Sequence, residues 1–290
     1  MTNKHNSILS RLRLNFIFKL VSAFLFIALS FAVIMAFKLI LKQFGIYETL
    51  VGRTFFTIIF VLMIFLAYSF YVKIIEKRKV TEYSKKHLFK ELSLGILIGA
   101  GLISFQIFIL WLLGLYSVTN IVFSSGIIMT LLLSIITGFA EELINKGIIF
   151  RILEEKLGTW IALIIVGLEV GVSHMSNTGA TTYSTLAVSL EFGIMLVLIY
   201  MLTRRLWVVT GFHIAWNFTM GGIFGQNVSG IDAKGLFVSN LNGPTYLTGG
   251  VFGIEVGIIA IILSFTITVF LTLYIIKKKL YEKRVWIRNK

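Results

Sequence analysis

The stretch Gly138-Phe139-Ala140-Glu141-Glu142-Leu143-Ile144-Asn145-Lys146-Gly147 decides how this chain folds. The residues that precede its first carboxylate, 92–140, contain no Asp, Glu, Lys or Arg. An ionisable side chain at the centre of a bilayer costs roughly 2.5–3.5 kcal/mol on insertion scales. Two carboxylates and an ammonium group at the end of such an apolar stretch therefore indicate a functional site inside a membrane.

The composition is that of a polytopic membrane protein. The chain has 290 residues, of which 57% are hydrophobic, and its mean hydropathy is +0.92. It contains no cysteine, which excludes disulfides, thiolate nucleophiles and thiolate metal sites. No polar linker or internal repeat divides it, so we expect one integral membrane domain over residues 1–290.

Apolar stretches of about 20 residues are long enough to cross the hydrocarbon core of a membrane. The sequence therefore predicts an all-α bundle of about eight membrane-spanning helices, at 17–39, 54–73, 92–114, 121–150, 159–176, 182–203, 206–226 and 250–276. Small residues at a spacing of four, Gly95/Gly99 and Gly167/Gly171, predict close approach of neighbouring helices.

The basic residues predict the orientation of the bundle. If the N-terminus is cytoplasmic, the Lys and Arg residues fall on the cytoplasmic side except for Lys38, Lys42, Arg53 and Lys234. The positive-inside rule then predicts a multi-pass protein of the cell membrane with both termini in the cytoplasm. This topology also explains the net charge of +14, so we expect no nucleic-acid partner.

The charged stretch has a defined geometry on a helix. Glu141 and Glu142 lie about 100° apart, so they face different directions. Lys146 follows Glu142 by four residues and Asn145 follows Glu141 by four, so each pair shares a face. We expect Lys146 to hold Glu142 ionised while Glu141 points into a cavity as a general base. The alternative is a salt bridge that only assembles the helices.

Histidine and asparagine add to this cluster. His213 and Asn217 are four residues apart and share a helix face, and His174 lies near the outer end of its span. Each has an alternative role as a hydrogen-bonding residue between helices. Three more carboxyl groups are expected to be protonated and bonded to neighbouring helices: Glu169, Glu191 and Glu255. For Glu169 the alternative is that it lines the same space as His174.

Missing motifs exclude several intramembrane proteases. An aspartyl protease needs two membrane aspartates, but the chain has only Asp232, in a predicted loop. A rhomboid-type protease needs Gly-x-Ser-Gly, and the most similar sequence is Asn-Val-Ser-Gly at 227–230, in the same loop. The metalloprotease motif His-Glu-x-x-His is also absent. The remaining set of two Glu, two His and one Asn can activate water and stabilise an oxyanion.

Three motifs in this order resemble those of the CAAX protease and bacteriocin-processing (CPBP or Abi) family, which includes type II CAAX prenyl endopeptidases. They are Glu141-Glu142-Leu143-Ile144-Asn145-Lys146, Val170-Gly171-Val172-Ser173-His174 and His213-Ile214-Ala215-Trp216-Asn217. The resemblance assigns a catalytic core to 121–256. It implies an eight-helix intramembrane endopeptidase with a cavity open toward the cytoplasm.

The resemblance also implies roles for the motif residues. Glu141 and His174 would activate the hydrolytic water, and His213 and Asn217 would form the oxyanion hole. The substrate would be a membrane-associated peptide or protein within the lipid bilayer. Family members are described both as metalloproteases and as metal-free glutamate proteases, so zinc is a candidate cofactor, with Glu141, His174 and His213 as its candidate ligands.

Two positions depart from the family pattern. Glu142 would support the site through the residue at 146, where Lys146 replaces an arginine and loses the planar fork that grips a carboxylate. Val170 replaces an aromatic residue four positions before His174. These departures keep open a second function, that of a non-catalytic membrane scaffold or bacteriocin-immunity-type regulator. A proton-relay transporter is a third, but the inverted repeats typical of transporters are absent.

Overall fold

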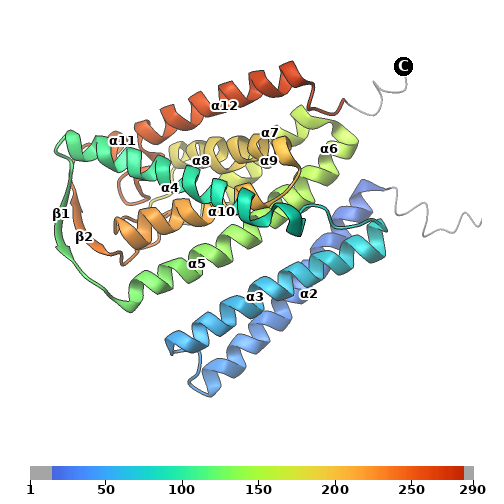
Figure 1. The fold of residues 1–290 in the computed structure, drawn as a ribbon, viewed down its shortest axis with the longest axis horizontal. Coiled ribbons are helices and arrows are strands. Elements are labelled where there is room, and N and C mark those ends of the chain that lie inside the picture. The colour runs from blue at the N-terminus through green and yellow to red at the C-terminus, as the bar shows by residue number, and fades with distance from the viewer. Residues whose placement is uncertain (1–14, 284–290) are drawn as a thin grey trace, which may run out of the picture.

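The computed structural model describes residues 15–283, and most of them are helical (Figure 1). The ends of the predicted domain, 1–14 and 284–290, lie outside the described residues. The α-helices are α2 (Phe16–Gln43), α3 (Leu50–Tyr71), α4 (Leu88–Leu112), α5 (Ser125–Glu142), α6 (Arg151–Leu157), α7 (Thr159–Ser173), α8 (Thr182–Val188), α9 (Leu196–Thr203), α10 (Trp207–Asn217), α11 (Thr245–Thr248) and α12 (Ile258–Lys278).

Several of these helices continue into wider or tighter turns. The π-helical segments are η1 (Val72–Glu76), η3 (Leu143–Phe150), η4 (Ser189–Met195) and η5 (Phe218–Ile223). The 3₁₀ turns are η2 (Lys85–His87) and η6 (Ile254–Val256). In Figure 1, α2 and α3 form a hairpin beside α5, and the remaining helices pack together on the other side of α5.

Among the described residues, six helices are long and apolar enough to cross a membrane. They are Phe16–Gln43, Leu50–Glu76, Lys85–Leu112, Ser125–Leu157, Thr182–Thr203 and Ile258–Lys278. The protein is therefore a multi-pass helical membrane protein. The predicted span 159–176 is a shorter helix, Thr159–Ser173, and 206–226 is α10 continued by η5. The count of eight and the cytoplasmic termini remain predictions.

The bundle also contains a small sheet that the prediction of an all-α fold did not include. Strands β1 (Tyr116–Ile121) and β2 (Phe237–Leu241) pair antiparallel, with Tyr116 opposite Leu241. Two of the predicted spans, 121–150 and 250–276, begin several residues before the helices of the structure do. Residue 121 is still in β1, and α12 begins only at Ile258. Before α12, Gly249, Gly250 and Gly253 all have positive φ, which turns the chain and prevents a continuous helix from 250.

Glycines bring the site helices into backbone contact, as their spacing predicted. A Cβ atom on Gly95 of α4 would lie 2.0 Å from the carbonyl oxygen of Val208 in α10. A Cβ atom on Gly171 of α7 would lie 2.0 Å from Ser189 Oγ in η4. No larger residue fits at either point without moving a helix. The glycines therefore fix the positions of α10 and α7, which carry the histidine motifs.

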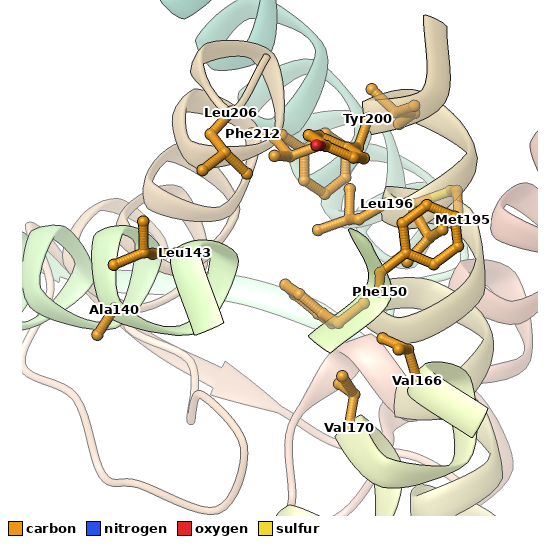
Figure 2. Close-up of a cluster of buried hydrophobic side chains, with 14 of the residues drawn as sticks. Ala140, Leu143, Phe150, Val166, Val170, Met195, Leu196, Tyr200, Leu206 and Phe212 are labelled. Carbon is orange, nitrogen blue, oxygen red and sulfur yellow. The ribbon is translucent and has the colours of Figure 1, made fainter. Parts of the chain in front are cut away.

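An apolar cluster packs against the site helices (Figure 2). Its side chains come from α5, α7, α10, the π-helical segments η3 and η4, α9 and the residue before α10. The members labelled in Figure 2 are Ala140, Leu143, Phe150, Val166, Val170, Met195, Leu196, Tyr200, Leu206 and Phe212. All ten are buried. This packing holds the end of α5 against the neighbouring helices directly after Glu142.

Candidate functional site

A cavity of about 420 Å³ lies between α5, α7, α10 and the loop 226–234, which we call the rim loop. The motif residues Glu141, His174, His213 and Asn217 line this cavity. The other polar residues of the lining are Thr130, Ser134, Thr137, Asn145, Glu169, Ser173, Asn177, Ser229 and Asp232. The structure thus brings together residues that are far apart in the sequence.

Glu142 is the centre of a buried charged cluster beside the cavity. Its side chain is 1% exposed, and Lys146 Nζ lies 3.0 Å from its Oε2, which is the pairing that the four-residue spacing predicted. Lys146 is fully buried and also donates to the carbonyl oxygen of Phe192, at 2.7 Å. Burying an ion pair is costly unless further hydrogen bonds satisfy its members, and the Phe192 carbonyl supplies one of them.

The same carboxylate also reaches α10. His213 Nδ1 lies 2.9 Å from Glu142 Oε1. Because a carboxylate only accepts, the proton of this bond belongs to Nδ1. The ring is packed against Phe192, with 4.8 Å between the ring centroids. His213 is therefore held at both its polar edge and its face. The neutral ring has its proton on Nδ1, so Nε2 can also donate only in the imidazolium form.

Glu141 is placed differently from Glu142. It lines the cavity and is half-buried, and it has no hydrogen-bond or ion-pair partner among residues 15–283. Asn145, one turn later, also lines the cavity. Its side chain is 8% exposed and likewise has no partner in the described part of the chain. A carboxylate and an amide are thus left free to act on a molecule inside the cavity.

His174 lies where α7 ends. Its Nδ1 is 2.8 Å from the carbonyl oxygen of Val170, one turn earlier. Since a carbonyl oxygen only accepts, Nδ1 carries the proton, and Nε2 of the neutral ring is an acceptor. Ser173 Oγ donates to the same carbonyl at 2.7 Å. The backbone of Val170 therefore fixes the tautomer of His174.

Asn217 closes the cavity from α10. Its Nδ2 donates to Thr137 Oγ1 of α5, at 3.3 Å. That bond uses one of the two amide hydrogens, so the second N–H and the carbonyl oxygen of the side chain remain available. Directly after Asn217 the helix widens into η5, and directly after Glu142 α5 widens into η3. Such π-helical turns occur frequently at functional sites.

The rim loop is held by residues outside the three motifs. Glu255 Oε1 accepts from both the N–H and the hydroxyl of Ser229, at 2.7 and 2.8 Å. Asn177 Nδ2 donates to the carbonyl oxygen of Ser229 at 2.9 Å. Ser229 and Gly230 both have positive φ, as the centre of a tight type I′ turn requires. These contacts position one wall of the cavity.

The three additional carboxyl groups have three different environments. Glu255 is the buried anchor of the rim loop and also accepts from Trp216 Nε1 at 3.3 Å, so it bonds a neighbouring helix as predicted. Glu191 is buried in η4, and neither oxygen has a hydrogen-bond partner among the described residues. Glu169 is exposed and has no hydrogen bond among the described residues. It lines the same cavity as His174, which was the alternative prediction for Glu169. Among these residues Glu169 thus makes no bond to a neighbouring helix, whereas the hydroxyl group of Ser264 in α12 lies beside the Glu191 carboxyl group, as the prediction for Glu191 requires.

Residues 122–219 match the family model described as type II CAAX prenyl endopeptidase Rce1-like. Over these residues the chain is similar to the CAAX protease family. The match contains all three motifs that carried the resemblance, and it ends before the rim loop and Glu255. Members of this family are typically proteases that act within membranes. The chain matches no curated protein sequence and no solved structure.

The positions of the candidate zinc ligands can be compared with what a metal ion needs. In residues 15–283, no group of three or more His, Cys, Asp or Glu side chains is placed to hold a metal ion. His213 Nδ1 is already bonded to Glu142 and His174 Nδ1 to a backbone carbonyl. Glu141, His174 and His213 line one cavity but do not form a metal site in this arrangement.

The two departures from the CAAX protease pattern are accommodated in different ways. Lys146 is fully buried, and its single ammonium group pairs with the Glu142 carboxylate. Val170 is also buried, and its side chain belongs to the apolar cluster of Figure 2. Neither substitution leaves the carboxylate or the imidazole of its motif without a partner.

Proposed function

We propose that this protein is an intramembrane endopeptidase that hydrolyses peptide bonds of membrane-associated peptides or proteins. The observation that carries the proposal is the position of Glu141. Within residues 15–283 its carboxyl group has no hydrogen-bond or ion-pair partner, yet it lines the same cavity as His174, His213 and Asn217. An unpartnered carboxylate beside imidazole and amide groups is the arrangement that general-base activation of water needs.

In this proposal Glu141 takes a proton from a water molecule, and the water oxygen attacks the carbonyl carbon of the scissile bond. His174 orients the water, because its Nε2 is free to accept the second hydrogen. When the C–N bond breaks, the proton on Glu141 passes to the leaving nitrogen. The products are a carboxyl group and an amine, and Glu141 returns to its starting form.

Asn217 and His213 stabilise the oxyanion of the tetrahedral intermediate. Asn217 has a free amide N–H in the cavity, and His213 in its imidazolium form presents Nε2–H at the ring edge that is not bonded to Glu142. Fixed donors at the position of a developing negative charge contribute more in a water-poor site than in water. Glu142 and Lys146 are positioning residues, since they act on the cavity through His213.

The same proposal places the protein in the cell membrane with both termini in the cytoplasm, as the distribution of Lys and Arg favours. The alternative function is a non-catalytic scaffold or immunity-type regulator. It is favoured by the buried Lys146–Glu142 pair, because its bonds to His213 of α10 and to the Phe192 carbonyl of η4 would hold the helices together without any chemistry.

The experiment compares peptides from cells that produce the wild-type protein with peptides from cells that produce Glu141→Gln. Glu48→Gln is the matched control, because Glu48 is exposed in the turn between α2 and α3. Peptide products that disappear with Glu141→Gln and persist with Glu48→Gln support the endopeptidase. Identical peptides from all three, with a cellular phenotype that survives Glu141→Gln, would assign the scaffold function instead.

A further inference from the structure

The cavity between α5, α7, α10 and the rim loop is lined by one sign of charge. Its acidic side chains are Glu141 of α5, Glu169 of α7 and Asp232 of the rim loop, and no Lys or Arg of the described residues lines it. The whole chain has the opposite balance, with 27 Lys and Arg residues against 13 Asp and Glu residues. The cavity is therefore an acidic site in a basic protein.

Two of these carboxyl groups have no task in the proposed hydrolysis. Glu169 and Asp232 are both exposed, and neither has a hydrogen-bond or ion-pair partner among residues 15–283. Lys234 lies two residues after Asp232, but it does not line the cavity, and the two side chains form no ion pair in the described structure. The free protein thus holds two carboxyl groups in one cavity without a cation in contact with either.

Glu169 belongs to the same electrostatic environment as the proposed general base. The charges of Glu141 and His174 act on it, as does the charge of Lys146. Lys146 does not line the cavity, however, and its buried ammonium group pairs with Glu142 instead. A cation that enters the cavity beside Glu169 would therefore meet a carboxyl group that no described Lys or Arg contacts.

A buried amide adds a hydrogen-bond acceptor to this acidic lining. Asn145 is 8% exposed, lines the cavity and has no partner in the described part of the chain. Buried polar side chains are nearly always hydrogen-bonded, so a free one beside a cavity indicates a partner that enters the cavity. The ammonium group of Lys and the guanidinium group of Arg only donate, and carboxylate and amide oxygens are their natural acceptors.

From the charge of the lining and the free amide together, we infer that the cavity recognises a Lys or Arg side chain of its substrate, with Glu169 and Asp232 as the residues that determine this specificity. The substrate is then a membrane-associated peptide or protein with a cationic residue close to the scissile bond. A cleft lined by one sign of charge also raises the local concentration of oppositely charged ligands. The inference rests on the proposed function for its substrate, but the cation can bind whether or not a peptide bond is cleaved.

The test uses two fluorescent probe peptides that differ at one position. Both are apolar chains of about 20 Leu and Ala residues with blocked ends, long enough to lie in a membrane-like environment. One has a single Lys at its centre where the other has a single Glu. Full-length protein in detergent micelles is titrated into each peptide, and fluorescence anisotropy gives the two dissociation constants. The ratio of these constants is compared between variants, so that differences in how the peptides partition into micelles cancel.

We expect the wild-type protein to bind the Lys peptide at least about 10-fold more tightly than the Glu peptide. Glu169→Gln and Asp232→Asn should each lower this ratio, and the double variant should bring it close to one. Glu48→Gln is the matched control, because it removes one exposed carboxylate that does not line the cavity, and it should leave the ratio unchanged. Asp232→Lys should reverse the preference in favour of the Glu peptide.

Equal binding of the two peptides by the wild-type protein, or a preference for Lys that survives in the double variant, would overturn the inference. Size-exclusion profiles show which variants are folded, and the loop variants Asp232→Asn and Asp232→Lys keep the test decisive if Glu169→Gln does not fold. Selective binding of the Lys peptide without any cleavage would contradict the endopeptidase and still support the cation specificity. Cleavage of both peptides with equal affinity would do the opposite.

Discussion

Glu142 and His213 are joined by a 2.9 Å hydrogen bond between Oε1 and Nδ1, across the contact between α5 and α10. The other oxygen of the same carboxylate lies 3.0 Å from Lys146 Nζ. One buried carboxylate therefore fixes both the lysine that follows it by one turn and the histidine that faces the cavity. This connection links the stability of the bundle to the geometry of the site.

The first prediction concerns this connection. Lys146→Ala should lower the free energy of unfolding by about 3–5 kcal/mol, because it leaves the Glu142 carboxylate buried beside an empty space. Lys156→Ala, at an exposed position near the end of α6, should change it by no more than about 0.5 kcal/mol. Denaturant unfolding in detergent micelles measures both. Equal stability of the two variants would show that the buried pair contributes nothing.

The second prediction concerns the oxyanion. Asn217→Ala should lower kcat about 10²–10³-fold with little change in KM, because the amide donor acts mainly on the developing charge. Thr137→Val removes only the hydrogen-bond partner of Asn217 and should have a much smaller effect. Steady-state kinetics on a cleaved peptide separate the two parameters. A change in KM alone for Asn217→Ala would assign the residue to substrate binding.

The third prediction concerns His174. His174→Gln should lower kcat by at least about 10²-fold, because the ring nitrogen that accepts from water is lost. Ser173→Ala should retain most of the activity, because the Val170 carbonyl still accepts from His174 Nδ1. Both variants are compared at equal amounts of folded protein. A Ser173→Ala enzyme as impaired as His174→Gln would mean that the hydroxyl, and not the carbonyl, positions the ring.

The fourth prediction concerns the rim loop. Glu255→Ala removes the acceptor of the Ser229 N–H and hydroxyl groups, so the loop 226–234 should open more often. Hydrogen exchange of peptides from this loop should become faster, while peptides from α4 are unchanged. Glu255→Gln keeps one acceptor oxygen and should lie between the two. Unchanged exchange in Glu255→Ala would show that other contacts hold the loop.

The fifth prediction concerns the helix contact that places His213. Gly95→Ala should lower the yield of folded protein strongly, because its Cβ atom would meet the carbonyl of Val208 at 2.0 Å. Gly101 is on the same helix and has open space where its Cβ would lie, so Gly101→Ala should be tolerated. Size-exclusion profiles of the two variants in detergent compare their folding. A well-folded Gly95→Ala protein would contradict the close contact between α4 and α10.

Some of this structure can be predicted from sequence because it depends on local spacing. Glu142 and Lys146 meet because they are four residues apart on one helix. The close approach at Gly95 follows from a pattern of small residues, although the pattern does not say that α10 is the partner. Long apolar stretches likewise predict membrane helices, but they do not show where glycines with positive φ delay the start of α12.

The remaining features depend on contacts between distant segments. The bond between Glu142 and His213 is set by how α10 crosses α5, which spacing within either helix does not determine. The anchoring of Ser229 by Glu255 joins two loops, and neither residue belongs to a motif. The π-helical segments are also invisible to a pattern search that assumes 3.6 residues per turn. Asn145 could have been assigned to the cavity from its four-residue spacing after Glu141.

The most direct test of the proposed chemistry is the turnover of purified protein in lipid vesicles, with Glu141→Gln compared with the wild-type protein on the same cleaved peptide. Loss of the general base predicts a decrease in kcat of about 10²–10⁴-fold, with an unchanged thermal unfolding temperature. A Glu141→Gln protein that cleaves the peptide at the wild-type rate would contradict the account.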